Sequence, residues 1–278
     1  MSASTTNSPF RHVRIEPSGG AAEWLELWAF RDLFLILAQR DVKLRYRQTA
    51  LGIVWVILQP LVAALIFAVI FGALANLPSD GVPYLLFVFA AILPWNLFAS
   101  GLQRAGNSLI SDARLITKIY FPRAIIPLAS TSSVLLDFGV AGAVMLVLMV
   151  INQTPLMLTT LMLPALVAIA LTVTVGVSFF FSALNVYYRD FAYALPFVIQ
   201  AWMYASPVVY SSSLIPEQWR FLYNLNPMVG VIDGFRWSLL GGQIPILAIA
   251  ESALVGIAML IAGAWVFRRV ERSFADVV

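Results

Sequence analysis

The chain has 278 residues, of which 61% are hydrophobic and 11% are charged, with a formal net charge of +3. Soluble domains carry about 25% charged residues, so this composition excludes an ordinary soluble protein and favours one that lives in a membrane. With no cysteine and a single histidine, His12, the sequence excludes disulfide and zinc-thiolate chemistry and leaves little for metal binding or proton relay. The basic residues are distributed by side of the membrane and not along one face, which argues against nucleic-acid binding.

A long uncharged run sets the fold class. No charged residue follows Asp137 until after Tyr188. As one helix this run would be about 75 Å long, against a hydrocarbon core of about 30 Å, so it must fold back, most naturally at residues 152–155. Only helices and closed barrels satisfy their backbone in lipid, and the strict alternation of a barrel strand is absent. We therefore predict an all-α, polytopic membrane protein.

Hydropathy predicts six transmembrane helices, and the distribution of charge orients them. All but two of the 17 Lys and Arg residues, Arg220 and Arg236, fall on the side that holds both termini, which the positive-inside rule places in the cytoplasm. The domain prediction is a polar tail (1–22), a cytoplasmic amphipathic helix (23–50), the six-span domain (51–270) and a cytoplasmic tail (271–278). The six predicted spans are 53–75, 83–103, 124–150, 156–185, 192–210 and 246–267.

The helix predicted before the first span is amphipathic and interfacial. Tryptophan and basic residues on such a helix favour the headgroup layer of an anionic leaflet. It serves either as a membrane anchor or, in addition, as part of a cytoplasmic gate. Its apolar stripe is Trp24, Leu27, Trp28, Phe34, Leu37 and Leu44. The gate or interface candidates are Arg40, Lys43, Arg45, Tyr46 and Arg47, with Arg189 and Asp190 from the turn after span four.

Two further segments lie outside the spans. Residues 107–122 are too apolar for a solvated loop, so they either pack on the protein's own helices or offer a short helix to a partner. In the outer loop, 211–245, Asn226 and Pro227 read as an N-cap and first-turn proline, and Gly241 reads as the end of that helix. With a second short helix at 213–219, this predicts a pair of short re-entrant helices. They act as a lid over an exit or pack at the interface.

These segments together resemble the membrane subunit of type-2 ABC exporters. The similarity is strongest to the branch that exports lipid-linked polysaccharides such as O-antigens and teichoic acids. It covers roughly residues 24–270 and depends on five motifs in order. They are Arg40-Asp41-Val42-Lys43-Leu44-Arg45-Tyr46-Arg47 with Leu51-Gly52 and Trp55 to Pro60; Leu115-Ile116, Lys118 and Tyr120-Phe121-Pro122-Arg123; Asn185 with Arg189-Asp190; Ser206-Pro207-Val208-Val209-Tyr210; and Asn226-Pro227-Met228 with Asp233 and Arg236.

The resemblance implies a half-transporter without its own ATPase. Two copies would form the channel as a homodimer in a bacterial cytoplasmic membrane, above two copies of a separate ATPase chain that binds ATP and Mg²⁺. The sequence has no GxxxxGK[ST] phosphate loop, which agrees with that division. Residues 107–122 become the coupling helix, through Asp112, Arg114, Leu115, Ile116, Lys118, Tyr120 and Phe121. The outer gate helices would use Asn226, Pro227, Asp233 and Arg236.

A glycan path requires weak, repeated contacts, because tight pockets would stall a polymer. Aromatic faces stack on sugar rings, and amides or hydroxyls form hydrogen bonds with sugar hydroxyls. The alternatives are interfacial belts or core packing for the aromatics, and helix–helix hydrogen bonds for the two glutamines. Candidate path residues are Trp55, Gln59, Tyr84, Phe87, Trp95, Phe197, Gln200 and Tyr204.

Two acidic residues lie inside predicted spans. Asp137 is placed near the middle of span three, and we expect no basic residue in any span to pair with it, which favours a hydrogen-bonded structural role over one in the path. Glu251 is expected to reach interfacial water.

Three other functions fit the hydropathy. They are an exporter of the same architecture for a drug or small hydrophobic molecule, a polytopic enzyme of lipid-linked sugars, and an ion-coupled secondary transporter. The scattered acidic residues disfavour the enzyme, and the lack of an evident inverted repeat disfavours the secondary transporter.

Overall fold

The computed structural model describes residues 27–47, 52–188, 190–271 and 274, and every regular element in them is helical. This confirms the predicted all-α class. In chain order the elements are α2 (Arg31–Arg47), α3 (Ile53–Phe67), η1 (Ala68–Leu74), α4 (Tyr84–Ser111), α5 (Ala113–Ile116), α6 (Ile125–Ser132), α7 (Val134–Ile151), η2 (Leu158–Met162), α8 (Leu163–Tyr187), α9 (Asp190–Tyr204), η3 (Ser212–Leu214), α10 (Glu217–Asn224), α11 (Pro227–Leu240) and α12 (Ile246–Glu271).

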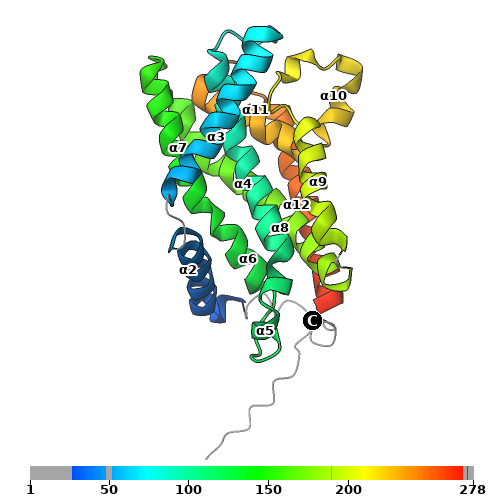
Figure 1. Cartoon of the computed structure of the whole chain (residues 1–278). Helices are drawn as coiled ribbons and strands as arrows, with labels where there is room; N and C mark the ends of the chain where they lie inside the picture. Colours follow the sequence, from blue (N-terminus) through cyan, green and yellow to red (C-terminus); the bar gives the residue numbers. More distant parts are fainter. Residues whose placement is uncertain (1–26, 48–51, 189, 272–273, 275–278) are drawn as a thin grey trace, which may run out of the picture.

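The helices form an elongated bundle with two distinct ends (Figure 1). α5 lies at one end, on the same side as α2 and the end of α12. α10 lies at the opposite end. We call these the α5 end and the α10 end.

Five of the six predicted spans correspond to helical segments that are long and apolar enough to cross a bilayer. The predicted fifth span corresponds to α9, which has 15 residues and is therefore about 22 Å long. α9 nonetheless runs from the α5 end toward the α10 end (Figure 1), so the count of six stays a prediction. The five segments are Val54–Leu74, Tyr84–Ser111, Ile125–Ile151, Leu158–Tyr187 and Ile246–Glu271.

α4 is the central helix of the bundle. In its most apolar window 78% of the residues are buried, against 17% to 33% in the other four segments. It packs on α3, α6, α7, α8, α9 and α11. Residues 86–95 of α4 are all buried, so the other helices surround this part of it.

Glycines allow α8 and α12 to pack closely. A Cβ atom on Gly263 would lie 2.0 Å from the carbonyl oxygen of Gly176, and a Cβ atom on Gly176 would lie 2.5 Å from the backbone nitrogen of Leu260. The two backbones are therefore in direct contact, as small residues allow in membrane helices.

The start and end of α11 agree with the predicted capping residues. The Asn226 side chain accepts a hydrogen bond from the Met228 amide and caps α11, Pro227 opens the helix, and Gly241 ends it at φ 84°. α11 is mostly buried and packs on α4, α8 and α12, so it is an internal re-entrant helix. α10 begins at Glu217, several residues after the start of the predicted 213–219 segment.

The amphipathic face of α2 differs in part from the prediction. Leu37 is buried, and Leu27 and Phe34 pack against the same cluster beside α6. Trp28 and Leu44, which we assigned to the same stripe, are 72% and 59% exposed and point away from the bundle. The reason is that Leu33 and Phe30 pack against the cluster and turn the contact face away from both residues. Trp24 lies outside the described residues.

Candidate translocation cavity

A polar stripe runs along the α5-end half of α4. Asn96, Ser100, Gln103 and Arg104 are spaced at i, i+4, i+7 and i+8, which places them on one face of the helix. Hydroxyl, amide and guanidinium groups along an otherwise apolar helix indicate a surface that faces protein or water and not lipid.

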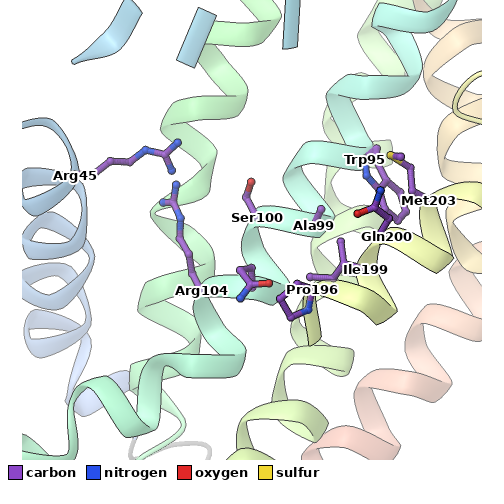
Figure 2. A pocket seen from close by; sticks show the side chains of 10 residues that line it. Arg45, Trp95, Ala99, Ser100, Arg104, Pro196, Ile199, Gln200 and Met203 are labelled. Atoms are coloured by element: carbon purple, nitrogen blue, oxygen red, sulfur yellow. The ribbon is translucent and has the colours of Figure 1, made fainter. Parts of the chain in front are cut away.

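Two cavities flank this stripe. The α9 cavity, of about 470 Å³, lies between α4 and α9 and is lined by Arg45, Trp95, Ala99, Ser100, Gln103, Arg104, Pro196, Ile199, Gln200 and Met203 (Figure 2). The α7 cavity, of about 320 Å³, is lined by Arg45, Val56, Gln59, Pro60, Ala63, Leu93, Asn96, Leu97, Ser100, Val134, Asp137, Phe138 and Ala141. Because Arg45 and Ser100 line both, the two cavities adjoin across the stripe.

An ion-pair cluster lies where the cavities meet. Arg104 donates to Asp137 at 2.7 Å and to Ser133 at 3.1 Å, Arg45 contacts the same Asp137 oxygen, and the Tyr46 hydroxyl donates to the other oxygen. We call these five residues the Asp137 cluster. It joins α2, α4 and the α6–α7 segment. Burial, followed by the hydrogen bond to the carboxylate, raises the pKa of Tyr46 to about 12, so this hydroxyl keeps its proton at neutral pH.

The expectation that Asp137 has no basic partner in a span is wrong. α4 continues eight residues past the predicted end of span two, so Arg104 belongs to the helix and not to a loop. α2 brings Arg45 to the same carboxylate from the other side. A charge inside a membrane protein needs such partners to offset its desolvation.

A second ion-pair cluster connects α2 to the start of α5. Arg40 donates two hydrogen bonds to Asp112, at 2.8 and 2.7 Å, and also contacts Asp41, whose other oxygen accepts from Ser130. These four residues are the Arg40 cluster. The hydrogen bond that Arg40 donates to Asp112 outweighs partial burial and raises the pKa of Arg40, which stays charged.

The predicted coupling segment is only partly helical. α4 ends at Ser111 and α5 covers four residues. Ile116 and Phe121 are buried in the cluster of apolar residues that also holds Leu37, and Leu115 packs against it. The outward surface is instead formed by Arg114, Lys118, Ile119 and Tyr120. The segment therefore presents two exposed apolar side chains between basic ones at the α5 end.

The predicted path residues divide into three groups. Gln59, Trp95 and Gln200 line the cavities, as do Arg45 and Arg104. A second group projects outward: Trp55, Phe197 and Tyr204 are exposed, and Gln200 donates to Tyr204 along the outer face of α9. Tyr193 extends this face, with Phe197, Gln200 and Tyr204, at helical spacing. Whether any of them contacts a substrate stays a prediction.

The third group, Tyr84 and Phe87, packs around a buried arginine. The guanidinium of Arg236 lies 3.6 Å from the centre of the Phe87 ring and donates to the carbonyls of Phe87, Val208 and Tyr210. Tyr84 donates to the carbonyl of Val209. These contacts fix the 206–211 segment onto α4 and α11. Arg236 therefore links this segment to α4 and α11. Its predicted role as a gate residue, with Asp233 at 3.6 Å, stays a prediction.

Other predicted residues occupy simpler positions. Asn226 joins α9 to α11, because it accepts from Trp202 and donates to Ala205 and Ser206. Lys43 is exposed and Asp190 begins α9, whereas Arg189 and the side chain of Arg47 lie outside the described residues. One carboxylate oxygen of Glu251 is buried without a hydrogen-bond partner among the described residues, whereas the residue as a whole is only partly buried, so the expected contact with interfacial water stays a prediction.

Sequence reasoning missed Asn96, Ser100, Gln103 and Arg104 as cavity residues. The available signal was their helical spacing, which continues through Asn107 and Ser111. We interpreted the first part as an apolar span and the rest as a loop.

A helical bundle of membrane-spanning length with a polar cavity beside its central helix agrees with a membrane transport subunit. A family model for the ABC-2 type transporter matches residues 32–240, and the chain belongs to this family. It is 29% identical over 248 residues to the O-antigen export system permease protein RfbA of Klebsiella pneumoniae, a match covering 89% of this chain and 95% of that protein. It is 30% identical over 259 residues to the O-antigen export system permease protein RfbA of Myxococcus xanthus, covering 90% and 97%. It is 23% identical over 218 residues to the polysialic acid transport protein KpsM of Escherichia coli, covering 74% and 80%.

Proposed function

We propose that this chain is the transmembrane subunit of an ATP-driven exporter that moves a lipid-linked, O-antigen-like polysaccharide across the bacterial cytoplasmic membrane. The observation that carries the proposal is the pair of adjoining cavities along the polar stripe of α4. Their amide and hydroxyl groups (Gln59, Asn96, Ser100, Gln103 and Gln200) match the weak hydrogen bonds that a moving glycan requires.

A homodimer would complete this path. The outer face of α9 exposes three aromatic rings and an amide, on Tyr193, Phe197, Gln200 and Tyr204. These groups suit either stacking on sugar rings or contact with a second copy of the chain. Contact with lipid alone does not require them. A second copy facing the cavities would convert open grooves into an enclosed channel.

The energy source belongs to a partner chain. The sequence has no phosphate loop, so ATP and Mg²⁺ bind the separate ATPase. The α5 end would be cytoplasmic, in agreement with the basic residues there. The exposed Ile119 and Tyr120, flanked by Arg114 and Lys118, would contact the ATPase.

The test is deletion of the gene followed by complementation. Deletion should abolish the surface polysaccharide and leave lipid-linked glycan accumulating on the cytoplasmic side. Complementation with Gln59→Leu and Gln200→Leu together should restore less surface glycan than the wild type. Gln243→Leu, a change at an exposed glutamine between α11 and α12, is the matched control. Normal surface glycan in the deletion strain contradicts the proposed substrate.

A further inference from the structure

The charges around the cavities do not balance. Among the described residues that line them, the charged ones are Arg45, Arg104 and Asp137, which leaves one positive charge uncompensated. The Arg40 cluster, on the same helix α2, shows the opposite arrangement, since one guanidinium contacts the two carboxylates of Asp41 and Asp112. The two ion-pair clusters on α2 therefore carry net charges of opposite sign.

The donors of this site are also in excess. The two oxygens of Asp137 are already engaged, one by Tyr46 and the other by both arginines. A guanidinium has five N–H donors, and the contacts with Asp137 and Ser133 use one nitrogen of Arg45 and two of Arg104. Figure 2 shows the two side chains extending toward one another from α2 and α4 at the edge of the α9 cavity. Ser100 and Gln103 add a hydroxyl and an amide beside them.

The site lies toward the α5 end of α4. This helix has 28 residues and is about 42 Å long, so it exceeds the hydrocarbon core of about 30 Å. Arg104 lies 20 residues after Tyr84 in this span, so a lipid phosphate on the α5 side of the bilayer would lie near it.

We propose that Arg45 and Arg104 bind the diphosphate that joins a polyprenyl carrier to its glycan, an inference that rests on the proposed function. A planar guanidinium binds phosphate through two parallel N–H···O bonds, so two such groups suit two adjacent phosphates. The lipid tail stays in the bilayer and the first sugar enters the adjoining cavities. Asp137 orients both arginines and sets the net charge of the site, so that it is a positioning residue.

The experiment measures binding of farnesyl diphosphate to the full chain in nanodiscs of zwitterionic lipid, with farnesol as the phosphate-free control. Arg104→Gln should raise Kd about tenfold, because a charge-assisted contact is lost. Asp137→Asn should lower Kd several-fold, since it leaves two positive charges. Arg31→Gln removes the same charge from the exposed start of α2 and should leave Kd unchanged.

A purely structural ion pair predicts the opposite for Asp137→Asn, which would then weaken or not alter binding. Unchanged Kd in both folded variants overturns the proposal. A second measurement needs no variant: farnesyl diphosphate should protect Arg45 and Arg104 of the wild type from phenylglyoxal and leave Arg31 reactive. Absence of that protection, or equal protection of the three residues, also overturns it.

Two competition measurements distinguish a diphosphate carrier from an ordinary phospholipid as the bound molecule. Inorganic pyrophosphate should compete, and phosphatidylglycerol should not. Competition by phosphatidylglycerol alone would mean an ordinary phospholipid site and would contradict the carrier assignment. Failure of binding with surface export intact contradicts this inference alone, whereas normal surface glycan in the deletion strain contradicts the proposed function.

Discussion

The contact between α8 and α12 gives the sharpest test of the fold. A Cβ atom on Gly263 would lie 2.0 Å from the carbonyl oxygen and 3.4 Å from the Cα atom of Gly176. Ordinary van der Waals contact begins near 3.4 Å, so Gly263→Ala requires the two helices to separate by about 1.4 Å. The obstructing atoms are backbone, and no side-chain rotation can relieve the clash.

The expected cost follows from two opposing effects. Overpacking a tight core costs about 1–3 kcal/mol, and a rigid backbone neighbour places this site at the upper end. Alanine recovers up to about 1 kcal/mol of helix propensity over glycine. Gly263→Ala should therefore destabilise the protein by about 2 kcal/mol. The assay is thermal unfolding in detergent followed by tryptophan emission, with the fraction of monodisperse protein as a second readout.

Gly142→Ala on α7 is the matched control. A Cβ atom there meets nothing within 4 Å, so the propensity effect acts alone and the variant should be as stable as the wild type or slightly more stable. A Gly263→Ala protein that melts with the wild type, or a Gly142→Ala protein that melts below it, would refute the reasoning.

Three further outcomes are expected. Ile116→Asp buries an unpaired charge and should prevent stable folding, whereas Ile119→Asp, at an exposed position, should melt like the wild type and reduce co-purification of the ATPase partner; equal melting of the two would contradict the burial pattern. Arg236→Leu leaves three carbonyl groups without their donor and should cost about 3 kcal/mol in detergent melts, so a loss below about 1 kcal/mol would argue against its structural role. Arg40→Gln and Asp112→Asn should each lower stability, and a double-mutant cycle should give a coupling free energy near 1 kcal/mol; strictly additive losses would show that the pair is not coupled.

Hydropathy and capping residues were enough to predict most of the fold. The spans follow from apolar length alone, since few other structures satisfy a backbone in lipid. α11 was predicted from Asn226, Pro227 and Gly241, because each has a local role that neighbouring residues suffice to indicate. α9 was harder, since its helix is shorter than the apolar run around it.

The cavity was less predictable, because its charges are matched over long distances in sequence. Arg104 and Asp137 are 33 residues apart, and Arg45 comes from a different helix altogether. Because the sequence does not reveal this pairing, we interpreted Arg104, which follows the predicted end of a span, as a loop residue. Gln59 and Gln200 were found because an amide in a span needs a polar environment wherever its partner lies. Aromatic residues have no such requirement, and Phe87 packs against Arg236 instead.

Among the contacts of helix α2, two arginine ion pairs, those of Arg40 and Arg45, lie five residues, or about 7.5 Å, apart along its axis. Arg40 binds the residue that precedes α5, and Arg45 binds Asp137 beside the cavities. Over so short a distance a helix moves as a rigid body. Mechanical work that displaces Asp112 at the α5 end would therefore act through α2 on Arg45, at the mouth of the cavity.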